Sequence, residues 1–442
     1  MPINVKDLKL PKFHPWFLPH DKSVNELINE GVELSKTNWI ANSIFGYTIL
    51  TNKDSSAIWK DPRWHNAVKL LADTNYDGDD DFYKQRQSIL VNLEGADHDR
   101  LKKIIAPYFT PSSVKKIRPF VSQIVNNSVY KSIGRNRLDM QKHIFDVIPA
   151  YIICNLIGIP TTDVKMLTNW SDQIFLTFGL IKPEDMDSIK KMAYEYIAYI
   201  DNLILNKKSN LGNDLISDLI RAEYNGDFLS NDEINMLIRV VISSGIDSTR
   251  GQLGLTFKML SEDSVSWQKL SSDRNLLESE VAKTFAMDGV VKQTARFASE
   301  DIIYNDVFFP KGTVVFPTVS IPNIQEPDAQ ALTFGRGLHY CLGASLAIVI
   351  VEETMSILSR QFPNVTCDEG VEYKESHRSS AGFISLPIKL KEVMNTEENI
   401  EELSIKLEIA IAMILNSEKY QSFSRNDVLK LIEKSFKSVI HN

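Results

Sequence analysis

The stretch Phe334-Gly-Arg-Gly-Leu-His-Tyr-Cys341-Leu-Gly343, followed by Ala344-Ser-Leu-Ala347, decides the fold of this chain. Its glycines free the backbone for positive φ angles or for close approach to a flat group. Cys341 lies just before an apolar helical run, where unpaired N–H groups and the helix dipole favour a thiolate with a lowered pKa. Such a thiolate can act as a ligand or a nucleophile. A single cysteine is more often a small buried hydrophobe, so the interpretation depends on the whole pattern.

The whole pattern resembles the haem-binding loop of cytochromes P-450, which reads F-G-x-G-x-H-x-C-x-G, then a small residue and L-A. The resemblance implies a haem b cofactor (iron protoporphyrin IX) whose iron is bound by Cys341. It also implies that Phe334 shields the sulfur, that His339 reaches a haem propionate and that Gly343 belongs to the haem-binding loop. The implied fold is mainly α-helical with small β-sheets, the cytochrome P-450 fold of the soluble bacterial type.

The composition is that of a large globular protein. The 442 residues are 43% hydrophobic and carry a formal net charge of −8, which argues against general nucleic-acid binding. No run approaches the roughly 18 apolar residues that span a membrane, and the N-terminus has no apolar signal region. The three cysteines are too sparse for a disulfide framework, so we expect a cytoplasmic protein.

We expect one haem domain over residues 1–392 and a helical C-terminal extension over residues 393–442. Two apolar stripes recur in the extension at three- and four-residue steps: Ile400, Leu403, Leu407, Ile411 and Ile414, then Leu429, Ile432, Phe436 and Ile440. Such stripes are typical of amphipathic helices, which bury their apolar face. The extension is therefore expected either to fold back on the haem domain or to bind another chain, for example in a dimer.

A second match to the family lies at His98-Asp-Arg-Leu-Lys102, where the family reads H-x-R-L-R. His98 and Lys102 are four residues apart and share one helix face. The resemblance implies that both contact haem propionates, although lysine offers a point charge in place of a bidentate arginine. Arg296, in a stretch that matches R-x-A-x-E-D, is the third propionate candidate. For His98 and Lys102, the alternative is that they belong to an ordinary basic helix on the surface.

Basic residues near this helix are candidates for docking an electron donor. The resemblance implies a separate ferredoxin or flavodoxin, since no reductase domain is fused. The residues are Lys103, Lys115, Lys116 and Arg118. Each of them can equally be an ordinary solvated charge.

A capping box at Ser230-Asn-Asp-Glu233 predicts the start of a long apolar helix that reaches about Leu260. Its interior holds Ser244-Gly245-Ile-Asp247-Ser248-Thr249. These are poor helix formers, and such a local violation often marks a functional site. The family pattern A-G-x-(D/E)-T lies over the haem. It implies that Gly245 permits a kink near bound O2, and that Asp247 and Ser248, with Thr249 beside them, relay protons. The alternative is a bend in the helix whose polar groups are all hydrogen-bonded and which has no catalytic role.

Candidate substrate-pocket residues occupy positions where the family has its roof helices, its proton-relay helix and its last hairpin. They are Phe175, Phe178, Ser244, Gly245, Ile321, Phe383 and Ile384. Aromatic residues at helical spacing are more often plain core packing. The polar segment 65–92 corresponds to the lid of the family's pocket, or else is a solvated loop.

The family's E-x-x-R motif is weakened or absent. Its nearest match is Glu280-x-x-Lys283, and the segment from Asn323 to Phe334 is about half the usual length, without the arginine that partners the motif. We infer a correlated loss, because a segment that no longer carries the third member of a charged triad need not be kept. The sequence therefore predicts a shortened segment before the cysteine loop and no Glu–Arg–Arg network.

The preferred interpretation is a haem-thiolate monooxygenase that oxidises a small or medium apolar organic substrate of a natural-product pathway with O2 and two electrons. The substrate is either free or tethered to a carrier protein. Two alternatives stay open. One is a P-450-type enzyme that couples, desaturates or rearranges its substrate, and the other is a non-catalytic haem-binding partner protein. The sequence does not name the substrate, because pocket residues vary freely within the family.

Overall fold

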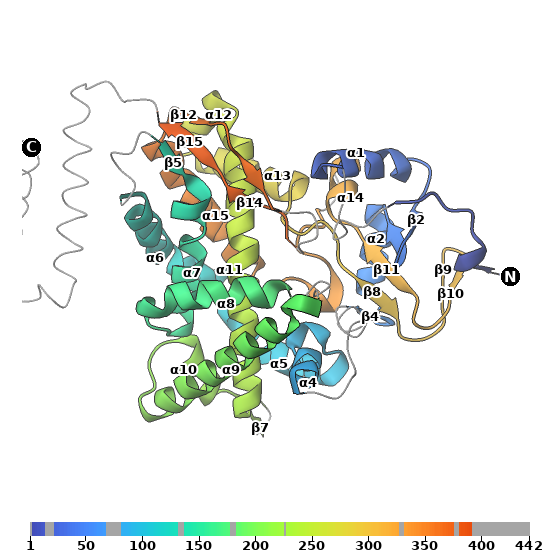
Figure 1. Ribbon diagram of the computed structural model, residues 1–442, viewed down its shortest axis with the longest axis horizontal. Helices are drawn as coiled ribbons and strands as arrows, with labels where there is room; N and C mark the ends of the chain where they lie inside the picture. The colour runs from blue at the N-terminus through green and yellow to red at the C-terminus, as the bar shows by residue number, and fades with distance from the viewer. Residues whose placement is uncertain are drawn as a thin grey trace, which may run out of the picture. The chain divides into compact units, whose positions relative to one another are not determined.

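A computed structural model gives the fold of the chain. It describes residues 2–13, 22–67, 81–130, 137–176, 183–224, 227–326, 331–374 and 380–390, all of them within the unit Met1–Leu390. The expected extension 393–442 and the pocket candidate Phe178 lie outside the described residues, and the side chain of Phe175 is not described. The architecture is mainly α-helical with small sheets, as predicted (Figure 1).

The helices form most of the molecule. Their bounds are α1 (Val24–Ser35), α2 (Asn52–Lys60), α4 (Asp81–Gln87), α5 (Gly95–Ile105), α6 (Pro111–Tyr130), α7 (Ile148–Ile157), α8 (Val164–Leu176), α9 (Met186–Ser209), α10 (Leu215–Arg221), α11 (Asn231–Ser261), α12 (Ser264–Lys269), α13 (Arg274–Met287), α14 (Ser320–Gln325) and α15 (Ala344–Gln361). The capping box predicted at Ser230 and Glu233 opens α11, and both of its hydrogen bonds are present.

The strands are short. They are β1 (Ile3–Asn4), β2 (Ile40–Ser43), β3 (Gly46–Ile49), β4 (Trp64–Asn66), β5 (Arg137–Asp139), β6 (Glu223–Tyr224), β7 (Asp227–Phe228), β8 (Arg296–Ala298), β9 (Ile302–Tyr304), β10 (Val307–Phe309), β11 (Val314–Pro317), β12 (Val365–Cys367), β13 (Glu372–Tyr373), β14 (Phe383–Ser385) and β15 (Pro387–Leu390). The largest sheet has the order β2-β3-β11-β8-β4, and its register places Asn66 opposite Arg296.

The core is organised around α11, which runs through the middle of the helical part of the molecule (Figure 1). It packs against α7, α8, α9, α13 and α15. Most of its residues are buried, and these include polar residues such as Asp247, Arg250 and Gln252 as well as apolar ones. The β2-β3-β11-β8-β4 sheet, with α1 and α2, forms a separate part that contains smaller apolar clusters.

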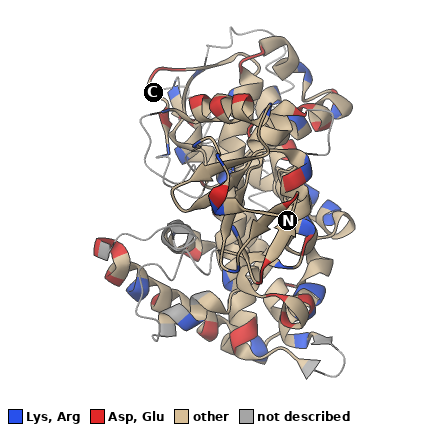
Figure 2. Cartoon of the chain, turned by 90° about the vertical axis from the view of Figure 1, so that its right-hand side faces the viewer, with Lys and Arg blue, Asp and Glu red and all other residues tan. Residues whose placement is uncertain are grey.

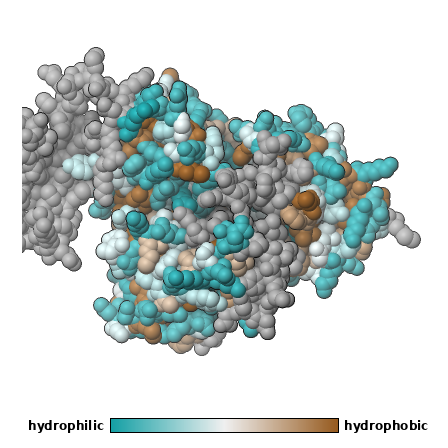
Figure 3. Space-filling view, in the orientation of Figure 1, coloured by the Kyte–Doolittle hydropathy of each residue, from teal (hydrophilic) through white to brown (hydrophobic). Residues whose placement is uncertain are grey.

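The surface carries both signs of charge. In the cartoon of Figure 2, Lys and Arg residues are interspersed with Asp and Glu residues along the described chain. Hydrophilic residues dominate the coloured surface in the space-filling view of Figure 3. Among the described helices, none is long and apolar enough to cross a membrane.

Candidate active site

The cysteine loop is closed by its own backbone. The N–H of Cys341 donates to the carbonyl of Phe334 at 2.9 Å, and the N–H of Gly335 donates to Leu332 at 2.8 Å. Gly335 and Gly337 both have a φ near +70°, a conformation that side chains other than glycine rarely adopt. A Cβ on Gly337 would also lie 2.3 Å from the carbonyl oxygen of Trp59 in α2. Glycine is therefore required there by both strain and space.

The sulfur of Cys341 is in a mixed environment. The residue is accessible to solvent, but protein surrounds it closely enough that burial raises the pKa of the thiol. The N–H of Gly343 and the charge of Lys102 oppose this rise without cancelling it. The predicted lowering of the thiol pKa is therefore wrong for the protein without a metal, because desolvation outweighs the helix N-terminus. A bound metal cation deprotonates a coordinating thiol outright.

Cationic side chains gather beside the loop. Helix α5 brings in His98 and Lys102. The ammonium of Lys102 donates to the carbonyl of Leu338, and the ring of His98 lies 4.9 Å from that of His339. Burial, together with His339 and Lys102, lowers the pKa of His98. Three of the predicted propionate contacts, from two distant segments, are thus side by side.

Arg296, the remaining predicted propionate contact, is 5% exposed. Its guanidinium donates to the carbonyl of Ala295, and burial lowers its pKa to about 10. In the described part of the chain, no carboxylate forms an ion pair with Arg296 or Lys102. The charge of Glu94 offsets only part of the lowering of the Arg296 pKa. A buried guanidinium without an ion-paired carboxylate is costly, so this position favours an anionic ligand.

Glu94 was missed in the sequence. Its Oε1 lies 3.0 Å from Nε2 of His339 and accepts from the backbone N–H of Asn66 at 3.1 Å. Burial raises the pKa of Glu94, but His339 and the N–H of Asn66 lower it by more. The carboxylate thus orients His339 between α5 and the strand opposite Arg296. Its only sequence signal is its place just before helix α5, which many carboxylates share.

These residues fit a haem. Cys341 offers a sulfur ligand, and Arg296 and Lys102 are cations without an ion-paired carboxylate, as two propionates require. The space beside Gly343 is open, since no atom lies within 4 Å of where its Cβ would be. A flat macrocycle could approach the backbone there.

Helix α11, which the resemblance to the family places over the haem, carries the predicted polar residues. Ser244 is exposed, and Gly245 and Ser248 are half-buried. The hydroxyl of Ser248 donates to the carbonyl of Ser244 at 2.6 Å, while Thr249 is buried. The helix is continuous through this stretch. A Cβ on Gly245 would lie 2.7 Å from Cδ1 of Ile153, so this glycine allows α7 to pack closely against α11.

Asp247 is held by residues that the sequence did not single out. Its carboxylate accepts from Arg250 at 2.5 Å, from the ammonium of Lys374 at 2.9 Å and from the hydroxyl of Ser380 at 2.5 Å. Burial raises the pKa of Asp247, but Lys374, Arg250 and Ser380 outweigh it and lower the pKa to about 2. Asp247 is therefore ionised and tied to Lys374, directly after β13, and to Ser380, shortly before β14. Lys374 and Ser380 lie more than a hundred residues away in sequence.

Two predicted pocket residues are core residues instead. Ile321 is fully buried in α14 against Phe13 and α1, where it fills the space above Gly31. Phe383 is 2% exposed, contacts Gly254 of α11 and lies 4.6 Å from the ring of Tyr373. Both were expected to face a pocket, but helix and strand geometry turn them inward. Ile384, the next residue of β14, is exposed.

The weak E-x-x-R match does not brace the cysteine loop. Glu280 and Lys283 form a 3.7 Å ion pair on α13, and the side chain of Lys283 is 55% exposed. Within the described part of the chain, neither residue forms a hydrogen bond or ion pair with residues 331–343. In the described part of the chain, no Glu–Arg–Arg network that includes Glu280 or Lys283 braces the cysteine loop.

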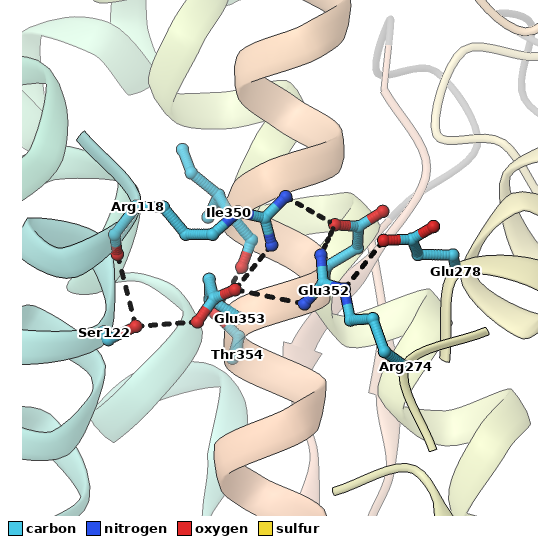
Figure 4. A network of polar contacts seen from close by, with 8 residues as sticks. All are labelled: Arg118, Ser122, Arg274, Glu278, Ile350, Glu352, Glu353 and Thr354. Carbon is cyan, nitrogen blue, oxygen red and sulfur yellow. Dashed lines mark hydrogen bonds and ion pairs between the residues drawn. The ribbon is translucent and has the colours of Figure 1, made fainter. Parts of the chain in front are cut away.

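A different charged network joins α6, α13 and α15 (Figure 4). Glu352 and Glu353 of α15 accept from Arg118 of α6 and from Arg274 of α13. Ser122 donates to Glu353 at 2.7 Å. Arg118, which was a candidate for docking an electron donor, is thus engaged inside the protein.

Comparison with known proteins finds cytochromes P450 among the relatives and among the similar structures. No family model matches the chain. It is 26% identical to luteothin monooxygenase of Streptomyces thioluteus, over 75% of this chain and 85% of that protein. It is 25% identical to cytochrome P450(MEG) of Priestia megaterium, over 68% of this chain and 78% of the relative. Epothilone D-bound cytochrome P450epoK superposes with a TM-score of 0.77 at 20% identity, covering 86% of this chain and 99% of that structure.

A second similar structure is P450BioI in complex with an acyl carrier protein ligated to hexadec-9Z-enoic acid. It superposes with a TM-score of 0.76 at 21% identity and covers 83% of this chain and 99% of that one. The fold and the cysteine site thus define a haem-binding oxidoreductase. The chain belongs to the cytochrome P450 family, and its matched curated relatives are bacterial.

Proposed function

We propose that the protein is a haem-thiolate monooxygenase that oxidises an apolar natural-product intermediate, with haem b bound through Cys341. The observation that carries this proposal is the grouping of two cations with the cysteine loop: the ammonium of Lys102 contacts the loop and acts on Cys341, and the buried guanidinium of Arg296 feels Glu94, the partner of His339 in the loop. Neither cation has a carboxylate ion pair in the described residues. Haem b supplies the redox chemistry of O2 when it is bound there. Its propionates would complete the charge balance of the cation cluster.

The residues of the chain would divide the remaining work. Arg296, Lys102 and His339 hold and orient the propionates, and Glu94 fixes the ring of His339. On the opposite side, the hydroxyl of Ser248 is partly accessible and can pass a proton by rotating away from Ser244. Asp247 can take up a proton for this relay only when Lys374 or Arg250 moves away, since both hold it ionised.

The substrate is proposed to be an apolar acyl or polyketide-like molecule, free or tethered to a carrier protein. Support comes from the relatives, which include luteothin monooxygenase and a polyketide biosynthesis cytochrome P450, and from the similar structure with an acyl carrier protein. Electrons would come from a separate ferredoxin or flavodoxin. The sparse cysteines favour a reducing compartment, the cytoplasm.

The test is turnover of the haem-loaded protein with a surrogate ferredoxin and its reductase. Medium-chain and long-chain acyl substrates, free and loaded on an acyl carrier protein, are incubated under ¹⁸O2. A product that carries one labelled oxygen atom is the expected result. Protein that binds haem and substrate but never incorporates label from O2 would contradict the monooxygenase proposal.

A coupling or desaturation reaction is the second candidate, because Asp247 is held ionised and Ser248 replaces the expected threonine. The same incubation separates the two, since desaturation or coupling gives a product that has lost hydrogen and carries no label.

A further inference from the structure

Asn323 of α14 is a buried asparagine with a bond at each end of its side chain. It is 4% exposed. Its Nδ2 donates to the carbonyl of Ala286 at 2.9 Å, and its Oδ1 accepts from the backbone N–H of Leu332 at 2.8 Å. One amide therefore joins the last turn of α13 to the segment that leads into the cysteine loop.

Thr333 adds a parallel contact. Its hydroxyl donates to the carbonyl of Phe285 at 2.7 Å and lies 3.5 Å from Nδ2 of Asn323. The rings of Phe285 and Phe334 are 5.3 Å apart. Phe285 at the end of α13 thus contacts both Thr333 and Phe334, and Ala286 is linked to Leu332 through Asn323.

The choice of partners follows from helix geometry. The last four carbonyls of a helix lack an intrahelical donor, and Phe285 and Ala286 lie in the last turn of α13, which ends at Met287. Asn323 and Thr333 supply the missing donors. Because both are neutral, they do so in a buried position without the desolvation cost of an ion pair.

Two backbone hydrogen bonds connect the segment that Asn323 and Thr333 hold to Cys341. Leu332, which Asn323 holds, accepts from the N–H of Gly335, and Phe334 accepts from the N–H of Cys341. Leu332 itself is fully buried against Trp59 and Val319. A shift of residues 332–334 would therefore move Cys341 directly.

We propose that Asn323 and Thr333 are positioning residues that hold the cysteine loop on α13, in place of a charged network. The inference rests on the proposed function insofar as the cysteine is a haem ligand. The pair of Glu280 and Lys283 does not perform this task, because its two members bond to each other and Lys283 is mostly exposed.

The variants are Asn323→Ala, Thr333→Val and Thr333→Ser in the full chain. Asn235→Ala is the control: Asn235 is also buried and also donates to a backbone carbonyl, that of Ile197. Its other side-chain partners, Asp201 and Arg239, do not belong to the cysteine loop either. The Asn235→Ala change should lower the stability of the fold by a similar amount while leaving the loop unchanged.

Two readouts are needed. Hydrogen exchange of peptides spanning residues 331–343 reports the loop itself, with or without haem. We expect exchange about tenfold faster in Asn323→Ala, a smaller increase in Thr333→Val, and wild-type exchange in Thr333→Ser and Asn235→Ala. In the haem-loaded, reduced, carbon monoxide-bound protein, Asn323→Ala should show a smaller fraction of thiolate-ligated haem than Asn235→Ala.

Unchanged exchange at 331–343 in Asn323→Ala, or an equal increase in Asn235→Ala, would overturn the inference. A thiolate fraction in Asn323→Ala equal to that of the control would overturn it too. If wild-type protein itself shows no thiolate-ligated haem, the proposed function fails, and hydrogen exchange still decides whether Asn323 and Thr333 hold the loop.

Discussion

The two sides of the site are built by different means. The cysteine side is built mainly from backbone. Its glycines have positive φ, its loop is closed by its own N–H groups, and the neutral side chains of Asn323 and Thr333 bond to carbonyls of α13. The α11 side depends on side-chain charge, because Asp247 is held by Lys374, Arg250 and Ser380. Local backbone geometry can be encoded in a short motif. The protonation state of a buried carboxylate depends on partners that can come from anywhere in the chain.

The comparison has a mechanical consequence. Moving the cysteine loop requires breaking backbone bonds within a compact segment, whereas releasing Asp247 requires only the displacement of Lys374 or Arg250. The cysteine side should therefore behave as a fixed ligand, and the α11 side as the part whose charge state can change. The predictions that follow test one side against the other.

The largest effect is expected from Cys341→Ser. Serine keeps the size of the side chain but removes the sulfur ligand, so the haem-loaded variant should lose the thiolate spectrum and all O2-dependent turnover. The control is Cys367→Ser, which changes a half-buried cysteine on β12. Full turnover in Cys341→Ser would show that the chemistry does not use this sulfur.

Asp247→Asn should leave haem ligation by the cysteine loop unchanged and slow the proton transfer that we assign to α11. The variant keeps the shape of the residue but removes the proton acceptor, and general acid–base steps of this kind contribute about 10²-fold or more. We expect O2 consumption with a surrogate ferredoxin to fall by about that factor, with a wild-type carbon monoxide spectrum. Asp201→Asn, which removes a carboxylate that accepts from Asn235 at 2.6 Å, is the control. Unchanged O2 consumption would make Asp247 purely structural.

Lys374→Met should raise the pKa of Asp247 and alter the acid dependence of stability. In the wild type the folded pKa is about 2, below the unfolded value of roughly 3.9. Asp247 therefore stabilises the fold above that unfolded value, and this contribution of about 2 kcal/mol is lost as the pH falls through the folded pKa. Urea unfolding at several pH values between about 5 and about 2.5 should show a flatter dependence in Lys374→Met. An identical dependence would mean that Lys374 does not hold Asp247 in solution.

The smallest effect is expected in the network of α6, α13 and α15, which lies outside the site. Glu352 is nearly buried and accepts from both Arg118 and Arg274, so Glu352→Gln should cost about 1–2 kcal/mol in urea unfolding. Glu278→Gln, at an exposed contact with Arg274, should cost less than about 0.5 kcal/mol. Neither change should alter the carbon monoxide spectrum. Equal costs for the two would contradict the role given to burial.

The sequence predicted the cysteine side well because its determinants are local. Gly335, Gly337 and Cys341 lie within one short motif, and His98 and Lys102 share a helix face by spacing alone. The capping box of α11 was equally local. These features can be recognised from residue type and spacing within a short stretch of sequence.

The sequence failed where packing or distant partners decide. Ile321 and Phe383 read as apolar residues near a pocket, but the faces of α14 and β14 turn them into the core. Glu94, Lys374 and Ser380 carry no motif, and their roles depend on which segments the fold brings together. The thiol pKa was predicted in the wrong direction because desolvation depends on the surrounding atoms. Asn323 was noted only as the end of a short segment.

The central claim is that Cys341 ligates a haem iron as a thiolate. The most direct measurement is the spectrum of the freshly prepared, haem-loaded, full-length protein after reduction and addition of carbon monoxide. We predict a Soret band at the long wavelength that thiolate-ligated haem gives, which disappears in Cys341→Ser and persists in Cys367→Ser. A band only at the shorter wavelength of a neutral ligand, or the same spectrum with and without Cys341, would contradict the account.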